Sequence, residues 1–240
     1  EYAASSVVSG NYCVVSNDMF ATQMADVFTV EVFVGGICVQ TNQVSVRDYA
    51  EYVLNAPVDG TNITEKDKAL VKELLNYGAA AQTYFDYNTE NIVSDGLDIT
   101  GAGAQEVPTS GAGLAGSGKV EGVVPYGATL VFRSQTAVRF LFQLENGTEG
   151  LTFKLGNSVV TPEYVEETGL WQVEAANIGP HNLDKTVSVT VTDGTSTLYM
   201  EYGPMSYIVR MNKNYDSDSL KNLLKALYNY HLAAKNLRAN

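Results

Sequence analysis

The chain has 240 residues, of which 45% are hydrophobic and 18% charged, which is enough to bury the cores of one or two globular domains. The formal net charge is −12. Because nucleic-acid affinity comes largely from clustered Lys and Arg, and no such cluster occurs, we exclude nucleic acid as a partner. Charges or glycines interrupt every apolar stretch before it reaches the roughly 20 residues of a membrane helix, so we expect no direct membrane insertion.

Two cysteines, Cys13 and Cys38, lie in the first part of the chain. They are too few for a disulfide scaffold and lack the paired Cys/His spacing of a zinc site, so we expect neither a metal nor a cofactor. In an oxidising compartment the two can form a Cys13–Cys38 bridge, and the alternative is two inert buried thiols. The chain begins at Glu1 without a charged and apolar leader, so we expect an export signal to have been removed.

The chain contains an internal repeat. Setting Tyr12 against Trp171 aligns YCVVSNDMFATQMADVFTVEVFV with WQVEAANIGPHNLDKTVSVTVTD without gaps. Each copy contains a strand in which apolar residues alternate with others, Val27 to Val34 and Thr186 to Val191, and this period is typical of a half-buried β-strand. A glycine-containing turn follows each strand and predicts a β-hairpin in both copies.

Helices are predicted after both hairpins. SVRDYAEYVLN and GPMSYIVRMNK align on Tyr49 and Tyr207 and predict short helices. LVKELLNYGAAAQTY and LLKALYNYHLAAKNL then share Leu, Lys, Leu, Asn-Tyr and Ala-Ala positions, and their apolar residues recur at three- and four-residue steps. We expect Thr64 to cap the first of these longer helices, and Asp216 or Ser217 to cap the second. We interpret the tyrosines of these helices, including Tyr77, Tyr84 and Tyr230, as packing residues.

The predicted fold class is α+β, with two related modules, each an antiparallel β-sandwich or sheet packed with a two-helix hairpin. The first module spans residues 1–88, a Gly, Ala and Ser-rich linker spans 89–118, and the second module spans 119–240. Strand-like segments precede Trp171, whereas almost nothing precedes Tyr12. We therefore expect the first copy to be truncated at its N-terminal end, with the chain being a piece of a longer protein or borrowing strands from elsewhere.

The segments SVRDYAEYVLN, KALVKELLNYGAAAQTYFDYNT and LLKALYNYHLAAKNL resemble a repeated module in large secreted and cell-surface proteins of gut clostridia, including ruminococci. The resemblance covers most of the chain. It implies a secreted, extracellular location on a bacterial surface, with other domains of a larger protein as neighbours. Such proteins are similar to adhesins and polysaccharide-degrading systems, but the resemblance carries no catalytic motif.

Sequence signals for catalysis are weak. GLAGSGK, from Gly113 to Lys119, matches half of a phosphate-binding loop, but Val120 replaces the Ser or Thr that would hold magnesium, so we interpret it as an accidental match. His181 and His231 lack a Ser or Cys partner in a recognisable motif, and we expect them to be packed or solvated. We therefore predict that the chain is not an enzyme.

The candidate ligand-binding residues are Trp171, the single tryptophan, and Tyr164, which lies seven residues before it. A flat aromatic ring can stack on a sugar, and the competing interpretation of Trp171 is a core aromatic. We predict a non-catalytic binding or adhesion module, with a dietary or host glycan as the favoured ligand. The alternatives are a binder of a host protein, such as a glycoprotein or immunoglobulin, through a strand edge or helical face, and a structural spacer.

Overall fold

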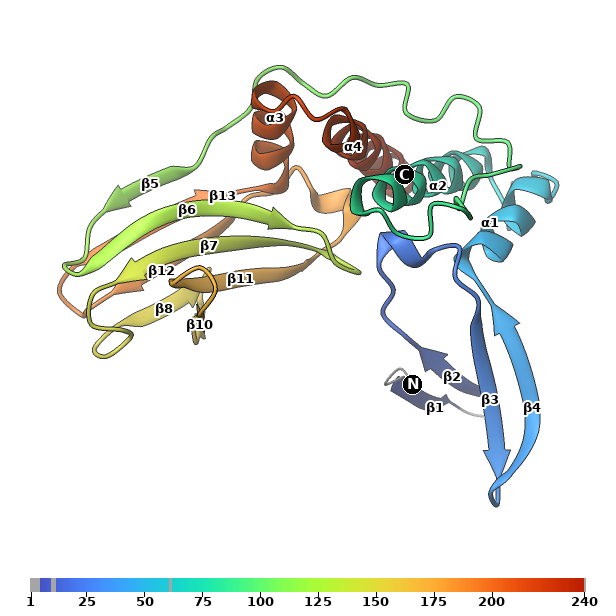
Figure 1. The fold of residues 1–240 in the computed structure, drawn as a ribbon, viewed down its shortest axis with the longest axis horizontal. Coiled ribbons are helices and arrows are strands. Elements are labelled where there is room, and N and C mark those ends of the chain that lie inside the picture. Colours follow the sequence, from blue (N-terminus) through green and yellow to red (C-terminus); the bar gives the residue numbers. More distant parts are fainter. Residues whose placement is uncertain (1–4, 10–11, 61, 240) are drawn as a thin grey trace.

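A computed structural model of the protein describes residues 5–9, 12–60 and 62–239, with side chains described from residue 16 onward (Figure 1). These residues form four α-helices and several antiparallel sheets, which confirms the α+β class. A β-sandwich, a layer of helices beside it and two N-terminal hairpins are the main parts of the molecule (Figure 1).

The sandwich has two antiparallel sheets. In spatial order, the first contains β10 (Glu163–Val165), β11 (Leu170–Ile178), β7 (Thr136–Leu144) and β6 (Val123–Val131). The second contains β5 (Ala115–Gly118), β13 (Thr197–Tyr202), β12 (Val187–Thr192), β8 (Thr152–Leu155) and β9 (Ser158–Val160).

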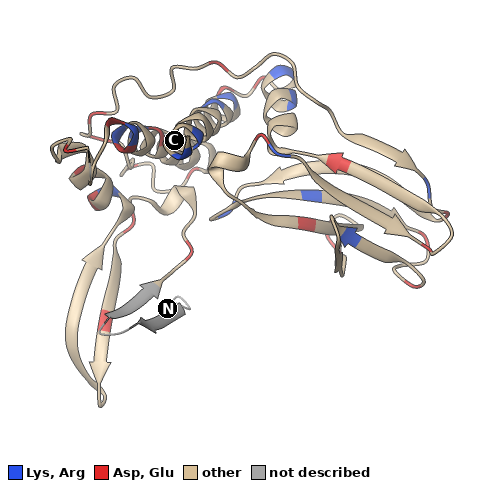
Figure 2. Cartoon of the chain, turned by 180° about the vertical axis from the view of Figure 1, so that it is seen from behind, with Lys and Arg blue, Asp and Glu red and all other residues tan. Residues whose placement is uncertain are grey.

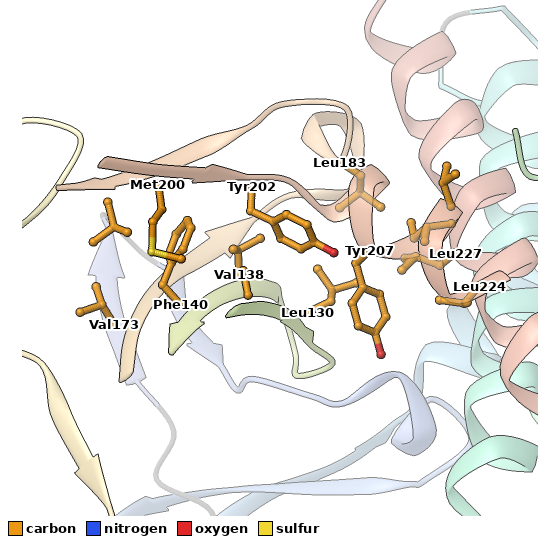
Figure 3. Packing of buried hydrophobic residues seen from close by; sticks show 14 of the residues in the cluster. Leu130, Val138, Phe140, Val173, Leu183, Met200, Tyr202, Tyr207, Leu224 and Leu227 are labelled. Carbon is orange, nitrogen blue, oxygen red and sulfur yellow. The ribbon is translucent and has the colours of Figure 1, made fainter. Parts of the chain in front are cut away.

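Alternate residues of the two sheets form the sandwich core (Figure 3). Phe140 and Phe142 of β7 and Val189 and Val191 of β12 are all fully buried. The rings of Phe142 and Phe153, from opposite sheets, lie 5.6 Å apart in an edge-to-face arrangement. Period-two alternation thus produces one apolar face on each sheet, and the two faces pack on each other.

Two helical hairpins, α1 (Val46–Asn55) with α2 (Glu65–Phe85) and α3 (Pro204–Asn214) with α4 (Asp218–Arg238), lie beside the sandwich (Figure 1). The predicted cap Thr64 is confirmed, since its side chain accepts a hydrogen bond from Asp67 N–H. Of the two candidates for α4, Ser217 and not Asp216 is the cap, and its side chain accepts a hydrogen bond from Leu220 N–H. Each cap satisfies a backbone donor that the helix itself leaves unpaired.

The long helices α2 and α4 pack against each other, which joins the two halves of the chain. The rings of Tyr77 and Tyr230 stack across this contact, with centroids 5.8 Å apart and planes 12° from parallel. Burial raises the pKa of both phenols, so both stay neutral. The interpretation as packing residues is confirmed for Tyr77 and Tyr230, whereas it does not hold for Tyr84, which is 36% exposed near the end of α2.

The N-terminal strands form two separate hairpins, β1 (Ser5–Ser9) with β2 (Tyr12–Ser16), and β3 (Phe28–Val34) with β4 (Ile37–Val44). The β3–β4 hairpin projects away from the helices, and every residue of β4 is exposed (Figure 1). The prediction of a sheet packed with helices therefore does not hold for this hairpin. Instead, α1 and α2 share a small core of their own that includes Val53 and Leu75.

Residues 89–118, for which composition predicts a flexible linker, make specific contacts with the helices. The Arg47 guanidinium donates to the carbonyl oxygens of Ile92 at 3.1 Å and Val93 at 2.7 Å, and Val93 is fully buried. The side chain of Asn229 both donates to and accepts from the backbone of Gln105. Side chains of the helices thus satisfy several backbone groups of this segment.

Candidate functional site

The two residues that the sequence singles out for ligand binding lie side by side. Tyr164 on β10 is directly opposite Trp171 on β11, and their ring centroids are 5.3 Å apart with the planes inclined by 50°. The turn between these strands closes where Gly169, at φ 68°, donates its N–H to the carbonyl of Val165. Such a positive φ favours glycine, so the local sequence produces the tight turn that pairs the two rings.

The two rings differ in burial. Trp171 is partly buried and packs against the sandwich core, while Tyr164 is 50% exposed. Trp171 also lies opposite Phe142, a fully buried residue of β7. The tryptophan therefore anchors the pair to the core, and the tyrosine presents a ring to solvent.

Polar groups lie on the opposite face of the same two strands. Gln172 Nε2 donates to Glu163 Oε2 at 2.7 Å, and Gln172 Oε1 is buried without a hydrogen-bond partner within the described residues. On the same face, Glu174 binds Arg133 and Arg139, each at 2.8 Å. Hydrogen-bonding groups thus lie within the same strand pair as the exposed ring, although they point away from it.

Cys38 is an exposed free thiol on β4, with its Sγ 3.5 Å from Thr41 Oγ1. The Cys13 side chain lies outside the described residues. The alternative of buried thiols does not hold for Cys38, and formation of a Cys13–Cys38 bridge under oxidising conditions stays a prediction.

Sequence reasoning missed an apolar cavity of about 270 Å³ between the 3₁₀ turn η1 (Ala21–Gln23), α2 and the turn that joins β6 to β7. Arg133 is one of the lining residues, and the aromatic part of the lining comes from Phe20, Tyr77, Phe85, Tyr87 and Phe132. The rings of Phe85 and Phe132 are 6.2 Å apart. These residues are far apart in sequence, and no local pattern indicates that they meet.

Both histidines have structural partners. His231 on α4 is buried, and its Nδ1 lies 2.7 Å from the carbonyl oxygen of Pro180 in the 3₁₀ turn η2 (Pro180–Asn182). His181 Nε2 lies 2.8 Å from an Arg238 nitrogen, and burial together with that guanidinium lowers the His181 pKa. The two contacts hold η2 against α4.

Two kinds of site are not found in the part of the chain that the structure describes. None of its His, Cys, Asp and Glu side chains gather in threes to hold a metal ion. Its helices are too short or too polar to cross a bilayer.

Comparison of the chain with protein-family models, with curated proteins and with solved structures gives no match. The functional argument therefore depends on the residues of this chain and their geometry.

Proposed function

We propose that the chain is a non-catalytic binding module of an extracellular bacterial surface protein, formed from two copies of one structural unit, with a dietary or host glycan as its ligand. The observation that carries the glycan assignment is the half-exposed Tyr164 ring, held against the core-anchored Trp171.

The order of elements supports the two-copy part of the proposal. The first half runs β2, η1, β3, β4, α1, α2, and the second runs β11, η2, β12, β13, α3, α4. The spacing from the end of η1 at Gln23 to the start of β3 at Phe28 equals the spacing from the end of η2 at Asn182 to the start of β12 at Val187. The helices α2 and α4 each have 21 residues. In both halves the 3₁₀ turn contacts the long helix.

A sugar ring offers an apolar face of C–H groups and a rim of hydroxyls, so its binding site needs an exposed aromatic face with hydrogen-bonding groups nearby. Tyr164 supplies such a face at fixed orientation, because Trp171 holds one side of it. Glu163 and Gln172 flank the ring along the two strands but point to the opposite face of the sheet, so they do not belong to the ring's own face.

The structural roles of the most plausible proton-transfer groups support a non-catalytic role. His231 bridges α4 to η2, and His181 binds Arg238. Glu73, whose pKa burial raises, accepts the N–H of Gly103 with both carboxylate oxygens at 3.0 Å. Each of these groups is engaged in holding the fold.

The test is binding of the purified chain to a panel of polysaccharides, with serum and mucosal glycoproteins alongside. We expect saturable glycan binding that Tyr164→Ala weakens about tenfold, equivalent to about 1.4 kcal/mol. Tyr126→Ala is the matched control, because Tyr126 is 68% exposed on β6 of the same sheet and should not contribute.

Equal binding by the Tyr164→Ala and Tyr126→Ala variants would remove the aromatic pair from the proposal. If Phe85→Ala abolished binding instead, the ligand would belong in the apolar cavity. Binding to glycoproteins but to none of the polysaccharides would favour the host-protein alternative. Binding to no member of the panel would favour the structural spacer.

A further inference from the structure

The apolar cavity between η1, α2 and the β6–β7 turn lies where the two halves of the chain meet (Figure 1). On its inner side, Tyr77 is 7% exposed and Ala81 is 1% exposed. On its outer side, the side chains of Phe20 and Phe85 are nearly half exposed. The cavity is thus buried on one side and accessible to a small molecule on the other.

The aromatic walls of the cavity are held in place by the protein itself. The backbone N–H of Phe20 donates to Gln23 Oε1 at 3.0 Å, and the Phe20 carbonyl accepts the N–H of Gln23 at 2.9 Å. The Phe132 ring lies 6.2 Å from the Phe85 ring and 6.2 Å from the Tyr207 ring, edge to face with both. A ligand would therefore enter a preformed site and lose little affinity to the ordering of side chains.

The corresponding place in the second half is spanned by a polar contact. The alignment of Tyr12 with Trp171 places Thr22 at His181, and the alignment of Leu70 with Leu223 places Phe85 at Arg238. His181 Nε2 lies 2.8 Å from an Arg238 nitrogen, whereas Thr22 and Phe85 line the cavity. The two aligned regions thus differ at this place, so the cavity is not a gap that the shared order of elements imposes.

The lining also carries a positive charge. Arg133 Nη1 lies 2.8 Å from Glu174 Oε1, while Arg139 binds the other oxygen of Glu174 through Nε at 3.2 Å and Nη2 at 2.8 Å. Two guanidinium groups therefore share one carboxylate, which leaves a surplus of one positive charge in a chain with 27 acidic and 15 basic residues (Figure 2). The Nε and Nη2 of Arg133 have no hydrogen-bond partner among the described residues, and the side chain is half exposed. Free guanidinium N–H groups of this kind are suited to bind a carboxylate.

One acidic side chain, Asp26, contacts the lining from outside. Its Oδ2 accepts the hydroxyl of Tyr87 at 2.7 Å, and its Oδ1 accepts Asn88 Nδ2 at 3.1 Å. Asp26 does not itself line the cavity, so it fixes Tyr87 without placing a carboxylate beside a ligand.

We infer that this cavity binds a small aromatic carboxylate, with its ring among the aromatic side chains and its carboxylate on Arg133. Aromatic walls favour an aromatic ring, because edge-to-face and offset contacts add to the burial of apolar surface. The volume of about 270 Å³ falls at the lower end of the usual range for ligand sites, which suits a single ring with a short acidic arm. A sugar fits less well, because each buried hydroxyl would need a partner that a lining of rings and alanines does not supply.

The experiment titrates the isotope-labelled full chain with phenylpropionate and, separately, with its neutral amide, phenylpropanamide, and follows the backbone amides by NMR. We expect saturable shifts at residues 20–22, 81–87 and 132–135, with a dissociation constant for phenylpropionate of about 1 mM or tighter. The amide should bind roughly tenfold more weakly, because it cannot form a charge-assisted pair with Arg133.

Two variants of Arg133 test its role. Arg133→Gln should weaken phenylpropionate binding roughly tenfold and abolish the preference for the acid over the amide, whereas Arg133→Lys should retain that preference. Glu174 keeps its pairing with Arg139 in both variants, so both should fold, which urea unfolding checks.

The aromatic wall is tested by Phe85→Ala, which should weaken phenylpropionate binding at least about fivefold. Its matched control is Tyr126→Ala, an exposed aromatic of β6 that does not line the cavity and should leave binding unchanged.

The inference would be overturned by the absence of saturable shifts at tenfold that concentration, by equal affinities for the acid and the amide, or by equal losses for Phe85→Ala and Tyr126→Ala. Shifts centred on Tyr164 and Trp171 would also overturn it, since they would place the probe on the other aromatic pair. The inference is independent of glycan binding, and Tyr164→Ala should bind phenylpropionate normally, so either proposal can fail without the other.

Discussion

The same substitution at equivalent positions of the two hairpins should have very different costs. Val191→Ala removes two methyl groups from a fully buried side chain of β12, whereas Val32→Ala removes them from a β3 side chain that is 41% exposed. At about 0.8 kcal/mol per buried methylene, plus a cavity term, Val191→Ala should lower the free energy of unfolding by about 2–3 kcal/mol. Val32→Ala should cost about 0.5 kcal/mol or less.

Urea unfolding measures both values. Trp171 is the single tryptophan and packs on the sandwich, so its fluorescence reports on the second half, while circular dichroism follows the helices of both halves. We expect the midpoint to shift for Val191→Ala with an unchanged m-value. Comparable losses for the two variants would mean that Val32 is covered in the isolated chain, and the description of Val32 as exposed would then be wrong.

Two further predictions concern the helices. Gln82 is fully buried, and its side-chain amide accepts the N–H of Val93 at 2.8 Å and donates to the carbonyl oxygens of Asn88 and Asn91. Gln82→Leu should therefore lower the free energy of unfolding by about 2–4 kcal/mol, measured by thermal or urea unfolding. The control Thr83→Ala, at an exposed neighbour, should cost less than about 1 kcal/mol. A loss below about 1 kcal/mol for Gln82→Leu would contradict the structural role of its amide. The hydrogen bonds from Thr64 lower the Asp67 pKa below its ordinary value of 3.8, so the stabilisation is present above that pH and is lost as pH falls through the folded-state pKa. Asp67→Asn should therefore cost about 0.5–1 kcal/mol at pH 7 and flatten the acid limb of the stability profile, and an unchanged acid limb would exclude this role for the cap.

Local patterns in the sequence predicted most of the elements. The predicted strands Val27 to Val34 and Thr186 to Val191 agree with β3 and β12 to within one residue at each end. Alternation and helical periodicity are set by which face of an element is buried, so they can be read from neighbouring residues. The adjacency of Tyr164 and Trp171 also follows from local sequence, because a tight glycine turn joins their strands.

Long-range contacts were not predictable in this way. The Gly, Ala and Ser content of residues 89–118 is typical of a linker, yet distant side chains such as Arg47 and Asn229 bind the backbone of this segment. Similarly, the aromatic cavity combines residues from three separated segments. No periodicity in a single segment encodes such contacts, because they depend on how whole elements pack.

Burial of the β3–β4 hairpin was also mispredicted, for an instructive reason. Its alternation is as regular as that of β12, and Val30 and Val32 correspond to the core residues Val189 and Val191. The pattern indicates a face suited to burial, and whether the face is covered depends on strands that lie elsewhere. Alternation therefore predicted the type of element correctly but not its environment.

The central proposal is that one structural unit occurs twice, with the strand pair β12–β13 buried in a sandwich and the strand pair β3–β4 largely exposed. Native-state hydrogen exchange of the intact chain tests this most directly by comparing the amides of β3 and β4 with those of β12 and β13. We predict slow exchange throughout β12, which pairs with β8 and β13, and faster exchange in β3 and β4, which pair with each other and with no other described strand. Equally slow exchange in both hairpins of the isolated chain would contradict the account.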